Sequence, residues 1–161
     1  MKLLRSGKSV FVFQLSPREK QVLLETLELY PLVPASHHRL SNTGSPSESD
    51  ENQRLLEESL AEQRKENRKQ VQAMLEQPER FRETKNGLQF SLKHSEVEWL
   101  LQVLNDIRVG SWLALGEPEP GELPEISKQN LRYLMAMEVC GAFESLLLSA
   151  FGIAESPDWL E

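Results

Sequence analysis

Residues 13–27 read Phe13-Gln-Leu-Ser-Pro-Arg-Glu-Lys-Gln-Val-Leu-Leu-Glu-Thr-Leu27, and residues 90–104 read Phe90-Ser-Leu-Lys-His-Ser-Glu-Val-Glu-Trp-Leu-Leu-Gln-Val-Leu104. The two stretches match at an offset of 77 residues, with six identical residues in 15 positions. Each begins with the alternation typical of a strand and continues with the apolar spacing of a helix. An internal strand–helix duplication explains this match, and so does chance similarity between leucine-rich periodic segments. The sequence leaves both explanations open.

Local signals extend each stretch into a strand followed by a helix. A strand over 9–15 precedes Ser16, Pro17 and Glu19, which form an N-cap, a first-turn proline and a capping box for a helix over 17–29. The second stretch predicts a strand over 88–92 and a helix over 95–115, with Ser95 and Glu98 as its capping box. We expect the two strands to pair as a small two-stranded β element, supported by the helices.

The remaining segments predict two further helices and two long connections. A polar loop over 35–50, expected to be mobile, precedes a charged helix over 51–77. An acidic, proline-rich loop over 117–126 precedes a helix over 127–151 that is apolar nearly all round, as in the centre of a bundle. The predicted fold class is mainly α: a compact four-helix domain with a small two-stranded element, with residues 1–161 forming a single domain.

Charge and composition narrow the classes of function. The chain of 161 residues has a net charge of −7, and all of this excess lies in residues 109–161. Such an acidic surface disfavours nucleic-acid binding. A basic cluster of Arg64, Lys65, Arg68 and Lys69 is interleaved with acids, which is typical of a solvated helix face. We expect no membrane span, because no apolar run is long enough to cross a membrane. We also expect no signal peptide. A cytoplasmic, bacterial-type protein is the resulting expectation.

Signatures of catalysis are absent from the sequence. His37, His38 and His94 are scattered, and Cys140 lies alone in an apolar helix, so neither a metal site nor a nucleophile is indicated. The eight glycines are dispersed and form no phosphate-binding loop. We therefore expect no cofactor and no metal, and the balance is against an enzyme.

Two sets of residues are candidates for a site. Arg108 falls on the apolar stripe of its helix and Glu138 on a stripe of the last helix, so we expect them to form a buried ion pair or an anion site. Asn105 and Asp106 point away from that stripe, and with Trp112 they are a candidate partner surface. The alternatives are a register-fixing pair and ordinary solvated residues.

The segment Trp99-Leu-Leu-Gln-Val-Leu-Asn-Asp-Ile-Arg108, followed by Leu113, Gly116, Tyr133 and Glu144-Ser-Leu146, resembles the C-terminal half of a bacterial family. That family is uncharacterised, mainly helical and best represented in actinobacteria. The resemblance covers about residues 90–150, and both long loops depart from it. It implies a helical cytoplasmic protein and draws attention to Glu144, but it carries no binding or catalytic role.

The leading expectation is a non-enzymatic protein-interaction or regulatory protein, with homo-oligomerisation left open. The first alternative is a small-molecule binding protein or enzyme with an anion pocket around Arg108. The second is a nucleic-acid regulator that uses the basic cluster.

Overall fold

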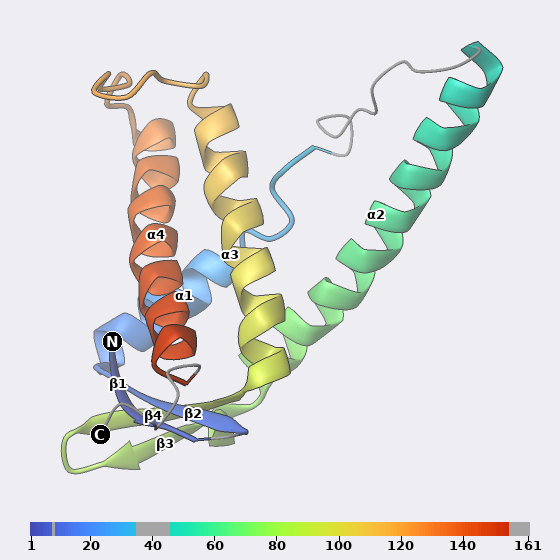
Figure 1. Cartoon of the computed structure of the whole chain (residues 1–161). Coiled ribbons are helices and arrows are strands. Elements are labelled where there is room, and N and C mark those ends of the chain that lie inside the picture. Colours follow the sequence, from blue (N-terminus) through green and yellow to red (C-terminus); the bar gives the residue numbers. More distant parts are fainter. Residues whose placement is uncertain (8, 35–45, 155–161) are drawn as a thin grey trace.

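A computed structural model describes residues 1–7, 9–34 and 46–154 (Figure 1). The strands are β1 (Lys2–Ser6), β2 (Val10–Leu15), β3 (Phe81–Thr84) and β4 (Gly87–Lys93). The helices are α1 (Pro17–Leu27), α2 (Pro46–Glu76), α3 (His94–Ala114) and α4 (Lys128–Ala154), with a short 3-10 turn, η2, over Pro78–Arg80.

The sheet corrects the predicted fold class, because it has four antiparallel strands in the order β1-β2-β4-β3 and not two. The two central strands were predicted, and the two edge strands were missed. β1 reads Lys-Leu-Leu-Arg-Ser and β3 reads Phe-Arg-Glu-Thr, so both are short and charged. Charged, short edge strands resist pairing with other chains, but they carry little of the alternation by which a strand is recognised.

The two halves of the chain are related by a pseudo-twofold axis through the centre of the sheet. Phe13 in β2 pairs with Phe90 in β4, its own equivalent 77 residues later. In the first hairpin Arg5 pairs with Val12, and in the second Arg82 pairs with Gln89, again 77 residues later. The unit that is repeated is therefore a whole hairpin and its following helix.

The helix caps follow the same symmetry and correct another expectation. Glu19 accepts a hydrogen bond from the backbone N–H of Ser16 (2.7 Å), and Glu96 accepts one from the backbone N–H of Lys93 (2.8 Å). The capping box of α3 is therefore formed by Lys93 and Glu96, two residues before the predicted Ser95–Glu98 box. The other carboxylate oxygen of Glu19 forms an ion pair with the Met1 amino group, and that of Glu96 forms one with Arg80. These hydrogen bonds outweigh the opposing effect of burial, and the pKa of both carboxyl groups lies below its usual value.

The core lies between the sheet and the helices, all of which stand on one side of it (Figure 1). Its largest members come from both halves of the chain and include Phe11, Phe13, Leu23, Phe90, Leu104, Ile107 and Leu147. Helix α4 packs along α3, whereas α2 leans away from the other helices. Only Asn67, Val71 and Met74 of α2 are buried.

Two expectations about the long segments change. Residues 46–50 belong to α2, so the predicted polar loop is shorter than 35–50, and its remainder lies outside the described residues. Residues 128–152 form a helix long and apolar enough to cross a membrane by length and composition, contrary to the expectation that no such run exists. A third of its most apolar stretch is buried in the protein. Core helices pass the same test, so length and composition alone do not decide between the two roles.

Candidate functional site

Asp106 holds the segment that follows α1 against the side of α3. Its Oδ1 accepts hydrogen bonds from the backbone N–H groups of Leu32 (2.7 Å) and Val33 (3.2 Å), more than 70 residues earlier in the chain. One helical turn later, a Cβ built on Gly110 would lie 2.6 Å from the Leu32 Cβ. Asp106 and Gly110 therefore form one strip of α3 that receives this segment.

The other two residues of the predicted partner surface also contact their own chain. The Trp112 indole N–H donates to the carbonyl of Pro118 (3.2 Å), which ties the start of the acidic loop to α3. The Asn105 Oδ1 accepts a hydrogen bond from Arg108 (3.2 Å), and Asn105 is exposed. Asn105 and Asp106 line the same pocket, and Trp112 does not.

Arg108 forms its ion pair with Glu144. The prediction from the stripes of the two helices, which named Glu138 as the partner, is wrong. Arg108 Nε lies 3.1 Å from Glu144 Oε2, and Glu138 is exposed. The reason is that α4 is apolar nearly all round, so its pattern did not distinguish the face toward α3 from the outer face. The stripe of α4 that contains Glu138 was expected to face α3, but its residues Ala142, Ser145 and Ser149 are exposed.

The surroundings of Glu144 are apolar and incompletely hydrogen-bonded. Its Oε1 and the Ser111 Oγ are buried without a hydrogen-bond partner among the described residues. Burial raises the pKa of Glu144, and Arg108 opposes this effect. Burial and the neighbouring Glu144 raise the pKa of Cys140 to about 12. The thiol is therefore protonated at neutral pH and is not an activated nucleophile.

Replacing Arg108 by alanine is expected to destabilise the protein by about 1–2 kcal/mol at pH 7, since it leaves the buried carboxylate of Glu144 uncompensated while the arginine itself is half exposed. Because the pKa of Glu144 is raised in the folded state, the carboxyl group takes up a proton there first as the pH falls. The loss of stability caused by Arg108→Ala should therefore be smaller at pH 4 than at pH 7, because a protonated Glu144 needs no counter-charge. Urea unfolding at both pH values measures this, with Arg132→Ala on α4 as the control. An equal loss at both pH values would contradict the expectation.

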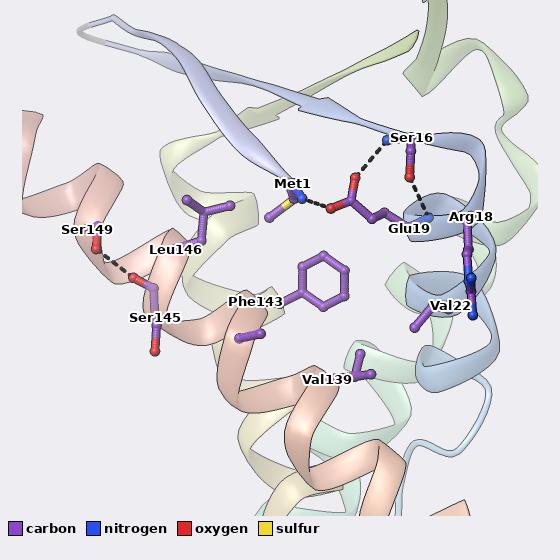
Figure 2. Close-up of a pocket in the computed structure, with 11 residues that line it drawn as sticks. Met1, Ser16, Arg18, Glu19, Val22, Val139, Phe143, Ser145, Leu146 and Ser149 are labelled. Atoms are coloured by element: carbon purple, nitrogen blue, oxygen red, sulfur yellow. Dashed lines mark hydrogen bonds and ion pairs between the residues drawn. The ribbon is translucent and has the colours of Figure 1, made fainter.

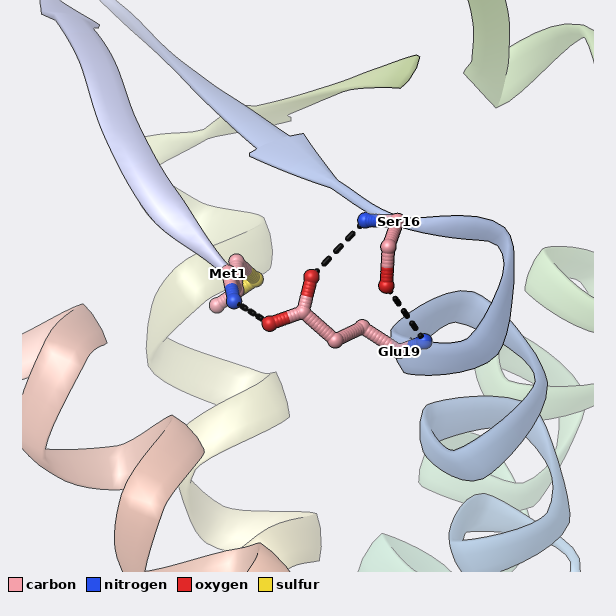
Figure 3. A network of polar contacts seen from close by, with 3 residues as sticks. All are labelled: Met1, Ser16 and Glu19. Atoms are coloured by element: carbon pink, nitrogen blue, oxygen red, sulfur yellow. Dashed lines mark hydrogen bonds and ion pairs between the residues drawn. The ribbon is translucent and has the colours of Figure 1, made fainter.

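A groove runs between α1 and α4, and we call it the α1–α4 groove. It consists of two adjoining cavities of about 610 and 490 Å³, and Val22 and Val139 line both. Figure 2 shows Phe143 and Leu146 from α4 facing Val22 from α1 across the first cavity. At this end, the groove is lined by Met1, Ser16 and Glu19, which form the polar network drawn in Figure 3.

A second pocket lies at the pseudo-equivalent place, between α2 and α3, and we call it the α2–α3 pocket. Its volume is about 340 Å³. Glu25 of α1, and Glu28 and Leu29 directly after it, line the α1–α4 groove. They correspond to residues of α3 that line the pocket 77 positions later. These are Gln102, Asn105 and Asp106. The same place under the two halves of the sheet is therefore lined by different side chains in the groove and in the pocket.

Neither the histidines nor the basic cluster of α2 gathers into a site within the described part of the chain. It holds no group of three or more potential metal ligands. His94 stacks on Phe11 with ring centroids 4.4 Å apart, while His37 and His38 lie outside the described residues. The basic cluster of α2 is divided, because Arg64 faces Asp106 (3.9 Å) and Lys69 faces Glu66 (3.8 Å).

Comparisons of the chain with protein-family models, with curated proteins and with solved structures found no match.

Proposed function

We propose that this protein is a non-enzymatic interaction protein of the cytoplasm, and that its α1–α4 groove binds an amphipathic helix of a partner protein. The observation that carries the proposal is the exposed apolar face of α4. Leu131 and Met135, which line the groove, are 46% and 56% exposed. Apolar side chains gathered along a groove are a common feature of protein-binding surfaces, whereas single exposed ones are not informative.

The spacing of exposed residues on α4 suits a second helix lying alongside. Leu131, Met135, Glu138, Ala142, Ser145 and Ser149 are exposed and follow one another at intervals of four and three residues. Helices that pack side by side have their contact residues at this spacing, and we call these six residues the seam. The seam runs over 19 residues, and the rise from its first to its last residue is about 27 Å, or five helical turns. The small side chains in its second half allow such a helix to approach closely.

Charges along the groove define the chemistry of the partner. Glu25 and Glu28 stand on the α1 side, and Lys128 and Arg132 stand on the α4 side. A bound helix would therefore pair basic residues with α1 and acidic residues with α4, with its apolar face toward Val22 and Val139 between them. The Met1–Glu19 contact leaves the other end of the groove without a free carboxylate.

The test is to capture partners from a native lysate with the wild-type chain and with Met135→Glu/Ala142→Glu, which places two charges in the seam. Gln89→Glu/Ser91→Glu adds the same two charges to the sheet and is the matched control. We expect the groove variant to lose a stoichiometric partner that the control retains. The binding segment of that partner, made as a peptide, should gain helicity on binding and lose at least tenfold in affinity for the groove variant.

Three outcomes would overturn this proposal. A partner retained by the groove variant would place the interaction elsewhere. Self-association that Met135→Glu/Ala142→Glu abolishes, measured by sedimentation velocity, would make a second copy of the chain the occupant. Flotation of the wild-type chain with lipid vesicles, lost in the groove variant, would make α4 a membrane-binding element.

A further inference from the structure

The α2–α3 pocket brings together four polar side chains that are largely removed from solvent. Tyr30 and Asn67 are 7% and 8% exposed, and the side chains of Arg64 and Asp106 are 19% and 15% exposed. Apolar walls from Val33, Leu60 and Val109 complete the pocket. A few polar groups converging between apolar walls are the usual composition of a small-molecule site.

Several hydrogen-bonding groups of this pocket are unused. The only contact of Arg64 among the described residues is with Asp106 Oδ2 at 3.9 Å, which is too long for a hydrogen bond. Asn67 donates its Nδ2 to the Tyr30 hydroxyl (3.4 Å), and its Oδ1 accepts nothing from the described residues. Neither group is among the fully buried atoms without a partner, so both are accessible from the pocket and can pair with a ligand that enters it.

The fold itself does not require polar residues here. Helix α2 lines the pocket with Leu60, Gln63, Arg64 and Asn67, and helix α4 lines its groove with Lys128, Leu131, Arg132 and Met135 at the same spacing. Asn67 therefore stands where the other groove has Met135, and Asp106 stands where it has Leu29. The equivalent helix pair packs without these two polar groups.

The charge and the free donors and acceptors define the ligand. Arg64 and Asp106 cancel each other, so an ionic ligand would introduce an uncompensated charge into a partly desolvated pocket. Arg64 offers N–H donors, and Asp106 Oδ2 and Asn67 Oδ1 offer acceptors close by. We propose that this pocket binds a small, uncharged, planar cyclic amide, whose carbonyl accepts from Arg64 while its N–H donates to Asp106 or Asn67. The oxo-pyrimidine and oxo-purine bases have this chemistry.

The proposal is tested by titration calorimetry of the full chain with uracil and hypoxanthine. We expect at least one to bind, and 1,3-dimethyluracil, which has the shape of uracil without its N–H groups, to bind at least tenfold more weakly than uracil. Benzoate and benzamidine carry the two signs of charge on a ring of similar size. Both should bind more weakly than the neutral amide.

Arg64→Leu and Asn67→Leu should each reduce the affinity at least tenfold. Arg132→Leu, at the equivalent position of α4, should leave it unchanged and is the matched control. We do not change Asp106 in this test, because its carboxylate also holds residues 32 and 33. Thermal unfolding checks that Arg64→Leu and Asn67→Leu fold. Absence of binding by both bases at 10 mM ligand, tighter binding of benzoate, or full affinity in Arg64→Leu would each overturn the proposal. None of these results bears on the α1–α4 groove.

Discussion

Phe13→Ala and Phe90→Ala are each expected to lower the free energy of unfolding by about 3–5 kcal/mol. Both rings are fully buried, and the two residues face each other across the central strands β2 and β4. Phe90 also stacks on Phe81, with ring centroids 4.7 Å apart. Removing either ring leaves a cavity at the pseudo-twofold axis, where β2 and β4 from the two halves of the chain meet. Neither half of the chain can fill this cavity alone.

Urea unfolding followed by circular dichroism measures this effect. Gln89→Ala, next to Phe90 but on the open face of the sheet, is the control and should change the stability by less than about 0.5 kcal/mol. Because Phe13 and Phe90 are direct cross-strand neighbours, the double variant should lose less than the sum of the two single losses. A loss below about 1 kcal/mol for either single variant would show that the sheet centre is not part of the core.

The parts of the fold that could be predicted are those with a strong local signal. Ser16, Pro17 and Glu19 mark the start of α1 where the structure has it, because an N-cap depends on residues within one turn. The central strands carry alternating apolar residues because one of their faces is buried. The edge strand β3 has only four residues and no apolar alternation, and the Asn86-Gly87 turn is the one local signal of its pairing with β4.

The candidate site was less accessible from the sequence, because it depends on contacts between distant segments. Asp106 was singled out as part of a partner surface, whereas the structure shows it accepting hydrogen bonds from residues 73 and 74 positions earlier, in a segment with no distinguishing motif. The small-residue stripe of α4 was assigned to the interior. A helix with apolar residues on every side has no preferred face, and only the position of α3 decides which side is buried. The repeat offset of 77 was the signal that could have predicted equivalent places for α1 and α3 under the sheet.

Asp106→Ala is expected to destabilise the protein by about 3–4 kcal/mol, more than a surface carboxylate would. The change leaves the N–H groups of Leu32 and Val33 without their acceptor, and it also leaves Arg64 without its counter-charge. The segment after α1 packs so closely on Gly110 that water has little room to replace the carboxylate there. Thermal and urea unfolding measure the loss.

Two variants separate this structural role from a role in binding. Asn105→Ala removes the exposed neighbour and should cost less than about 0.5 kcal/mol. Asp106→Asn keeps one acceptor oxygen for the two N–H groups but removes the charge that faces Arg64. Its loss should therefore fall between those of Asn105→Ala and Asp106→Ala. If Asp106→Ala were as stable as the wild type, the carboxylate would not hold the segment, and its burial would then be explained only by a ligand.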